Sequence, residues 1–192
     1  LTDIVIHHLT ADRKVRIKCK DIIRSISLYK NKLAVQLSDK VCVYESSAEE
    51  DTDMHFRARK ERMTMSKRKS DLMIVASQHI IFTVDNVVEL YAFSGDRERV
   101  WYMDSPVNFI RVDGGPDGRE GVIFGLDNGI VGKLFCDNPF PLTLSTREKK
   151  IKCADSNLLR TMVASVDELG VLDVIDLHSQ TSLFKAENVV SV

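Results

Sequence analysis

The sequence predicts an all-β protein: a degenerate WD40-type β-propeller segment with about four four-stranded antiparallel blades and partial blades at both ends. Short runs of β-branched and aromatic residues alternate apolar with polar positions, which is the period of a half-buried strand. Turn residues, such as Asp-Asn-Gly at 127–129, join these runs into hairpins. The hairpins recur at a spacing typical of propeller blades, because their second strands centre 47, 44 and 40 residues apart, on Tyr44, Tyr91, Phe135 and Ile175.

Each repeat holds a central hairpin with one further strand on either side. The hairpins are predicted at 32–37 with 40–45, 79–85 with 87–93, 121–126 with 130–135, and 161–166 with 171–177. A first strand precedes each hairpin, at 23–28, 72–77, 108–112 and 151–155. A fourth strand follows it, at 54–59, 99–103, 142–145 and 182–186. The region 148–162 would also fit a weak helix, but a strand fits its neighbours better.

These strands divide the chain into one propeller segment with four complete blades. The blades are predicted at 20–62, 71–105, 106–146 and 150–187. Residues 1–19 supply only the last two strands of a preceding blade, and 188–192 the start of a following one. Because the chain starts at Leu1 rather than Met and a propeller must close, we expect it to be cut from a longer protein. The repeat is degenerate, since no Gly-His or Trp-Asp pair marks the blade ends and Trp101 is the single tryptophan.

Composition excludes several classes of protein. The formal net charge is −1, whereas a dedicated nucleic-acid binder usually carries a clear basic excess. The longest apolar runs are too short to cross a bilayer, and no signal peptide opens the chain. The spacing of the cysteines matches no zinc-binding pattern, and neither a metal nor a cofactor is predicted. The cysteines are expected to be small buried hydrophobic residues in a reducing compartment. They are Cys19, Cys42, Cys136 and Cys153.

The stretch "VDGGPDGREG" at 112–121 is the one candidate for a phosphate-binding loop. A dinucleotide fingerprint needs G-x-G-x-x-G followed by a helix, but here two glycines are adjacent and a strand and hairpin follow. Pro116 also removes an N–H that a phosphate would use. We therefore predict a connector between the first and second strands of the third complete blade. Asp85, Asp127 and Asp167 recur at hairpin turns and are predicted to bond turn amides rather than catalyse, and no enzyme motif is present.

A charged segment at 45–71 is the one candidate binding surface. An acidic block, "ESSAEEDTD", precedes a basic one that could grip phosphates of a lipid headgroup or nucleic acid. A solvated outer strand and a long inter-blade loop would explain the same pattern, and few aromatics interleave as base-stacking platforms. The candidate contact residues are Arg57, Arg59, Lys60, Arg62, Lys67, Arg68 and Lys69.

Four segments together resemble the intraflagellar transport protein 122 family, the WD-repeat subunit of intraflagellar transport complex A. They are "LTDIVIHHLTADRKVRIKC", "DMHFR", "FSG" and "GGPDGREGVIFGLDNG", and the resemblance covers essentially all 192 residues. It implies a place in the second of two N-terminal propellers and a non-catalytic scaffold role in cilia. That role is retrograde transport along the axoneme and import of membrane proteins, from the ciliary base and the cytoplasm.

The resemblance also implies partners. These are the other complex A subunits, with tubby-like adaptors, ciliary membrane cargo and dynein-driven trains further out, and no nucleic acid. It supplies no catalytic residues. The alternative that the residues leave open is a propeller that binds membrane headgroups or nucleic acid through the basic loop at 57–69.

Overall fold

Eighteen β-strands make up the regular structure of the described residues, and no helix is found among them. The computed structural model describes residues 2–9, 12–46, 56–64 and 70–191, with the side chain of only Arg57 described between 56 and 64. The strands form one two-stranded sheet and four four-stranded sheets, each of them antiparallel. None of the described residues lies in a helix that is long and apolar enough to span a bilayer. This architecture confirms the predicted all-β fold class.

Each four-stranded sheet is one blade, and its strands pair in chain order. The two-stranded sheet comprises β1 (Asp3–His8) and β2 (Arg13–Lys18). The first and second complete blades are β3 (Ser25–Tyr29), β4 (Lys32–Gln36), β5 (Lys40–Ser46) and β6 (Phe56–Thr64), then β7 (Leu72–Val75), β8 (His79–Val84), β9 (Val87–Ala92) and β10 (Arg97–Tyr102). The third and fourth are β11 (Val107–Gly114), β12 (Gly121–Leu126), β13 (Ile130–Phe135) and β14 (Leu142–Thr146), then β15 (Ile151–Ser156), β16 (Met162–Asp167), β17 (Leu172–Asp176) and β18 (Ser182–Ala186).

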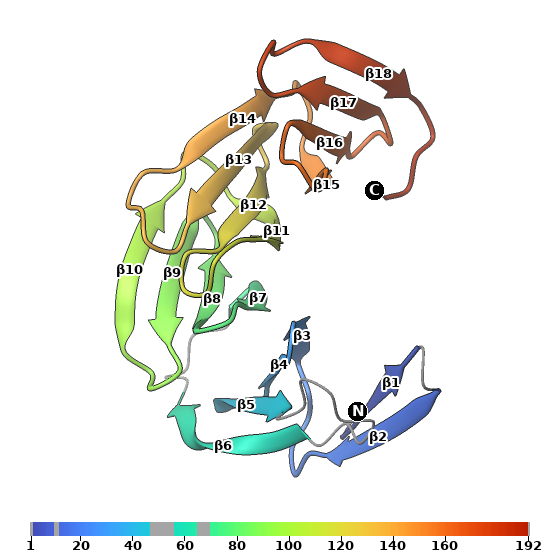
Figure 1. Cartoon of the computed structure of the whole chain (residues 1–192). Coiled ribbons are helices and arrows are strands. Elements are labelled where there is room, and N and C mark those ends of the chain that lie inside the picture. Colours follow the sequence, from blue (N-terminus) through green and yellow to red (C-terminus); the bar gives the residue numbers. More distant parts are fainter. Residues whose placement is uncertain (1, 10–11, 47–55, 65–69, 192) are drawn as a thin grey trace.

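The blades follow one another around an arc, with the first strand of each toward the centre and the fourth at the outside (Figure 1). The inner strands of neighbouring blades contact each other, β3 with β7, β7 with β11 and β11 with β15. In Figure 1 the arc is open between the β1–β2 sheet and the fourth blade. This arrangement brings the inner strands and the connectors that leave them into one central region.

The hydrophobic core lies between the blades rather than within them. In β8, Ile80 and Phe82 join the cluster shared with the first blade, while Ile81 joins the cluster shared with the third. In β12, Val122 and Phe124 face the second blade, and Ile123 faces the fourth. Since successive side chains of a strand point to opposite faces, a blade with neighbours on both sides buries both. This is why "HIIFTV" and "GVIFGL" are almost continuously apolar.

Two strand predictions need correction. The fourth strand of the first blade was predicted at 54–59; residues 54–55 lie outside the described residues, and β6 spans Phe56–Thr64, so residues 57–64 of the predicted basic loop are strand. The segment 188–192, predicted to open a following blade, forms no strand over the described residues 188–191. There the N–H of Val189 donates to the carbonyl of Gly170 at 2.9 Å, which ties this segment to the β16–β17 turn. Assignment of 1–19 and 188–192 to neighbouring blades stays a prediction.

Candidate functional site

The predicted basic site falls on β6, the outermost strand of the first blade, and on the segment after it. Arg57 is exposed and lies opposite Glu45 of β5. The backbones of Arg59, Lys60 and Arg62 belong to β6, but their side chains lie outside the described part of the structure. Lys67, Arg68 and Lys69 lie outside it altogether. The headgroup site therefore stays a prediction.

The connector between β11 and β12, which contains most of "VDGGPDGREG", occupies a central position among the blades. Asp117 accepts a hydrogen bond from Nζ of Lys30 in the first blade at 2.7 Å. The N–H of Gly118 donates to Oγ of Ser77 in the second blade at 3.2 Å. Gly118 has a φ of +78°, a backbone conformation that residues with a Cβ rarely adopt, so glycine suits this turn. The connector prediction is confirmed, and the segment also joins several blades.

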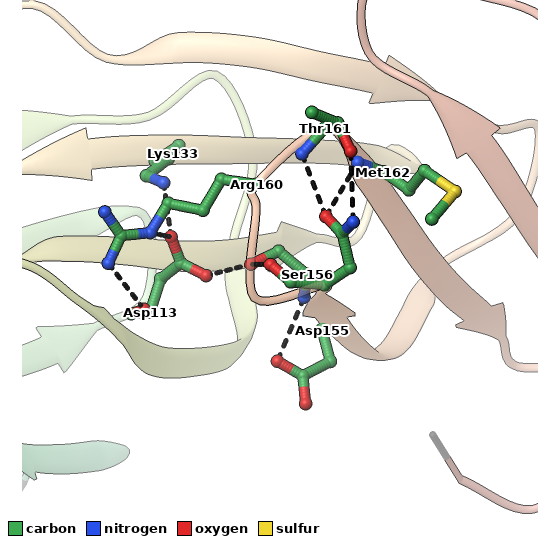
Figure 2. Close-up of polar contacts among 8 residues, drawn as sticks. Asp113, Lys133, Asp155, Ser156, Arg160, Thr161 and Met162 are labelled. Atoms are coloured by element: carbon green, nitrogen blue, oxygen red, sulfur yellow. Dashed lines mark hydrogen bonds and ion pairs between the residues drawn. The ribbon is translucent and has the colours of Figure 1, made fainter.

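Just before the connector, near the end of β11, a buried carboxylate, Asp113, joins the third blade to the fourth (Figure 2). Its side chain is 2% exposed and forms an ion pair with Lys133 of β13, which is itself 10% exposed. Nε of Arg160 lies 3.3 Å from Oδ2, and Oγ of Ser156 donates to Oδ1. Two cations and a hydroxyl thus satisfy both oxygens. A carboxylate compensated in this way holds blades together rather than reacting.

The turn that carries Arg160 is fixed by a side chain of its own. Oδ1 of Asn157 accepts hydrogen bonds from the N–H groups of Thr161 at 2.8 Å and Met162 at 3.0 Å, and Nδ2 of Asn157 donates to Oγ1 of Thr161. Figure 2 shows these bonds next to the Asp113 contacts. An Asn that bonds the backbone a few residues ahead stabilises a tight turn. The position of Arg160 over Asp113 is therefore built into the β15–β16 turn.

The connector ends at a second buried carboxylate, Glu120, which lies between the second and third blades. Its side chain is fully buried. One oxygen, Oε1, accepts hydrogen bonds from the N–H of Ser77 at 3.1 Å and from Oγ of Ser77. The other oxygen, Oε2, is buried and has no hydrogen-bond partner among the described residues. An unpartnered anionic oxygen in a protein interior is costly, so its surroundings are of functional interest.

Glu120 belongs to a group of three buried side chains that converge from two blades. One ligand-type atom each of His79, Glu120 and Cys136 lies within 4.8 Å of the other two. His79 opens β8 of the second blade, whereas Glu120 and Cys136 flank the paired residues Gly121 and Phe135 of the third. The N–H of Cys136 also donates to the carbonyl of Glu120 at 3.1 Å. The backbone pairing of β12 with β13 therefore sets two of the three side chains beside each other.

The surroundings of Cys136 keep its thiol protonated at neutral pH. The pKa of Cys136 is raised to about 12, mainly by burial and also by the nearby charges of Glu120 and Asp137, while Arg99 opposes them. The four cysteines are free thiols, as the sequence suggested. Cys136 is buried and the other three are partly buried. Only among His79, Glu120 and Cys136 do ligand-type atoms gather in this way within the part of the chain that the structure describes.

The three turn aspartates have three different roles. Oδ1 of Asp167 accepts hydrogen bonds from the N–H groups of Leu169 and Val171, both at 3.0 Å, as predicted for a turn residue. Asp127 instead binds Nζ of Lys150 at 2.8 Å and the amide of Asn108, and these bonds hold its pKa below the usual value. Asp85 occupies the turn with a φ of +55°, a conformation that Asp tolerates better than most residues. The prediction that each bonds turn amides thus describes Asp167 and not Asp127.

No pattern in the sequence predicted the group formed by His79, Glu120 and Cys136. These residues are separated by 41 and 16 positions, so no short spacing motif could show them. One signal was available, because Glu120 ends a turn and directly precedes the buried strand 121–126. A charged residue at such a junction is expected to be exposed unless it has a partner.

Comparison with known proteins agrees with the geometry. The family described as "IFT122 second beta-propeller" matches residues 1–192. The chain is 40% identical over all 192 residues to the "Intraflagellar transport protein 122 homolog" of Mus musculus, and 39% identical to those of Danio rerio and Homo sapiens. It spans 15–16% of the length of these three relatives.

A solved structure described as "KlHsv2 with loop 6CD replaced by a Gly-Ser linker" has a TM-score of 0.67 to this chain. It is 12% identical and covers 99% of this chain and 62% of its own, a likeness that concerns the fold alone. The resemblance seen in the sequence is confirmed by the family match over the whole chain. The chain belongs to the family of the second β-propeller of intraflagellar transport protein 122.

Proposed function

We propose that this chain is part of a non-catalytic scaffold subunit of intraflagellar transport complex A. The observation that carries the proposal is the family match over all 192 residues. Because the chain spans about 16% of its curated relatives, what the whole protein does is inferred and not read from this segment. The role would be to support retrograde transport in cilia and ciliary import of membrane proteins. It would act at the ciliary base and along the axoneme, on the cytoplasmic side.

The packing of the blades fits a scaffold role. The buried carboxylate of Asp113 and its partners bind one blade to the next, and each inter-blade layer is an apolar core. Rigid rings of blades present broad surfaces to other proteins. Large apolar side chains remain exposed on the first and last complete blades: Ile26 and Leu28 on β3, Leu183 and Phe184 on β18. Other complex A subunits would bind the intact protein directly, with tubby-like adaptors, cargo and dynein-driven trains further out.

The test is affinity purification of the full-length protein from ciliated cells, with complex A subunits quantified by mass spectrometry. We expect these subunits to co-purify with the wild-type protein. Asp113→Ala should lower their recovery, because it removes the anion that joins the third and fourth blades. Asp155→Ala is the matched control, since Asp155 forms a half-exposed pair with Arg111. Failure of the wild-type protein to recover any complex A subunit would overturn the proposal.

A second candidate is binding of anionic headgroups through the basic segment at 57–69, with nucleic acid as the less favoured ligand. It is favoured by the exposed position of Arg57 on the outermost strand of its blade. Such binding should weaken at high salt and with Arg57→Glu. Lys152→Glu, an exposed lysine on β15, is the control. If the full-length protein bound phosphoinositide vesicles equally well at low and high salt, and with or without Arg57→Glu, this candidate would be excluded.

A further inference from the structure

We propose that His79, Glu120 and Cys136 form a zinc site that fastens the second blade to the third. The three side chains are buried, and one ligand-type atom of each lies within 4.8 Å of the others. An imidazole nitrogen, a carboxylate oxygen and a thiolate sulfur are the three donor types that zinc uses in proteins. The site arises from the packing of two blades, independently of the role of the whole protein.

Two unpartnered atoms are the first argument. Nδ1 of His79 and Oε2 of Glu120 are both buried and have no hydrogen-bond partner among the described residues. His79 is 9% exposed and Glu120 fully buried, so bulk solvent does not reach the two atoms. Buried polar atoms are nearly always satisfied, and two orphans in one cluster call for a shared partner. A cation between them would satisfy both at once.

The second argument is that the remaining atoms of both residues are held by other groups. Nε2 of His79 lies 3.0 Å from Oε2 of Glu98 on β10, so the ring donates there and leaves Nδ1 free as a ligand. A histidine that binds a metal usually donates its other N–H to a carboxylate or carbonyl in this way. Ser77 holds Oε1 of Glu120 through its N–H and Oγ, which leaves Oε2 free. Both orphan atoms are thus free to act as metal ligands.

Geometry and donor type select the metal. Zinc–ligand bonds of about 2.0–2.3 Å at a tetrahedral angle place neighbouring ligand atoms roughly 3.3–3.8 Å apart. The ligand-type atoms of the three residues, all within 4.8 Å of one another, lie near this spacing. A sulfur ligand excludes Mg²⁺ and Ca²⁺, which take oxygen, while the mixed N, O and S set suits Zn²⁺. On binding, the Cys136 thiol releases its proton to solvent and the thiolate becomes the sulfur ligand.

The experiment measures metal in the natural full-length protein, purified without chelators or a metal-binding tag. Zinc per chain is determined by mass spectrometry for the wild type, Cys136→Ser and Cys153→Ser. We expect Cys136→Ser to hold one zinc fewer than the wild type, and Cys153→Ser to equal it, because Cys153 is outside the cluster. Equal zinc in all three proteins would overturn the proposal and leave a buried water as the partner of the two orphan atoms.

A spectroscopic measurement protects the test against a variant that folds poorly. Cobalt replaces zinc, and a thiolate ligand gives a charge-transfer absorption that we expect in the wild type and in Cys153→Ser and expect to be weaker in Cys136→Ser. Should Cys136→Ser unfold, Glu98→Gln takes its place, since it leaves the three ligands in position. Loss of the carboxylate behind His79 should weaken zinc affinity about 10–100-fold, measured by competition with a chelator. Unchanged affinity in Glu98→Gln, with no thiolate band in the wild type, would overturn the proposal.

Discussion

Asp113 and Glu120 are buried carboxylates at the two ends of one connector, and they are satisfied to very different degrees. Asp113 has two cations and a hydroxyl on its two oxygens. Glu120 has Ser77 on one oxygen, while its other oxygen has no hydrogen-bond partner among the described residues. Both carboxylates lie between neighbouring blades, Asp113 between the third and fourth and Glu120 between the second and third.

The contrast distinguishes two ways of burying a charge. A buried carboxylate whose two oxygens both have partners within the chain has a structural role: it holds together the elements that supply those partners. A buried carboxylate oxygen that has no partner among the described residues, and that lies near an imidazole and a thiol, calls for a partner from outside the chain.

The largest effect is expected at Asp113. Replacing it with alanine leaves Lys133 and Arg160 without their shared anion, and Lys133 is only 10% exposed. We expect Asp113→Ala to lower the local stability of β11–β16 by about 3–5 kcal/mol, the cost of breaking a buried pair. Hydrogen exchange of the full-length protein measures this segment by segment. Asp155→Ala, which breaks the exposed pair with Arg111, should change it by about 0–1 kcal/mol, and equal effects of the two variants would refute the distinction.

Removal of zinc should affect the surroundings of Glu120 but not those of Asp113. With free zinc at 100 times Kd, binding stabilises the folded form by about 2.7 kcal/mol, so a chelator should lower protection of β8 and β12 by that amount. Glu120→Gln should be less stable than the wild type with zinc, and at least as stable without it, because the neutral amide removes a buried orphan charge. Hydrogen exchange with and without chelator measures both. If the order of stability of the wild type and Glu120→Gln were the same with and without zinc, the idea that Glu120 lacks a partner without zinc would be contradicted.

Ser77→Ala should have an intermediate effect. Ser77 Oγ donates to Glu120 and accepts from the N–H of Gly118, so its loss leaves the half-buried N–H of Gly118 without this partner, while Glu120 keeps the hydrogen bond from the N–H of Ser77. We expect a loss of about 1–3 kcal/mol, the usual cost of an unsatisfied buried group. Thermal unfolding and exchange of the connector amides measure it. Ser94→Ala, which removes an exposed hydroxyl bonded to Asp96, is the control and should be near neutral.

The smallest effect is expected at Asp117, the exposed carboxylate between the two buried ones. The hydrogen bond from Lys30 lowers the pKa of Asp117 below its ordinary value of 3.8. A lowered pKa means that the pair adds stability above the ordinary value and loses it as the pH falls through the lower folded value. Lys30→Met should therefore loosen the connector slightly at neutral pH and not at all in strong acid. Exchange of the connector amides measures this, and a difference that persists in acid would contradict it.

The strand order could be predicted because blades repeat a local pattern. The alternation of "GVIFGL" and the turn residues of "LDNG" act within a few residues of the chain, and β12 and β13 lie where these patterns place them. The length of β6 was less predictable, because an exposed outer strand of basic residues has the composition of a loop. Likewise the apolar "NVVSV" fits a strand, yet 188–191 forms none and its backbone bonds the β16–β17 turn instead.

The fold class, the blade repeat, the connector at 113–120 and the family could all be predicted from the sequence, because each depends on patterns of residues that are close together along the chain. Only the tertiary structure decided which polar side chains meet. His79 reaches Glu120 and Cys136, and Asp113 reaches Arg160, because separate blades pack side by side around one centre. Such contacts join residues from different blades, so they follow from how the sheets pack, and no spacing along the chain records them.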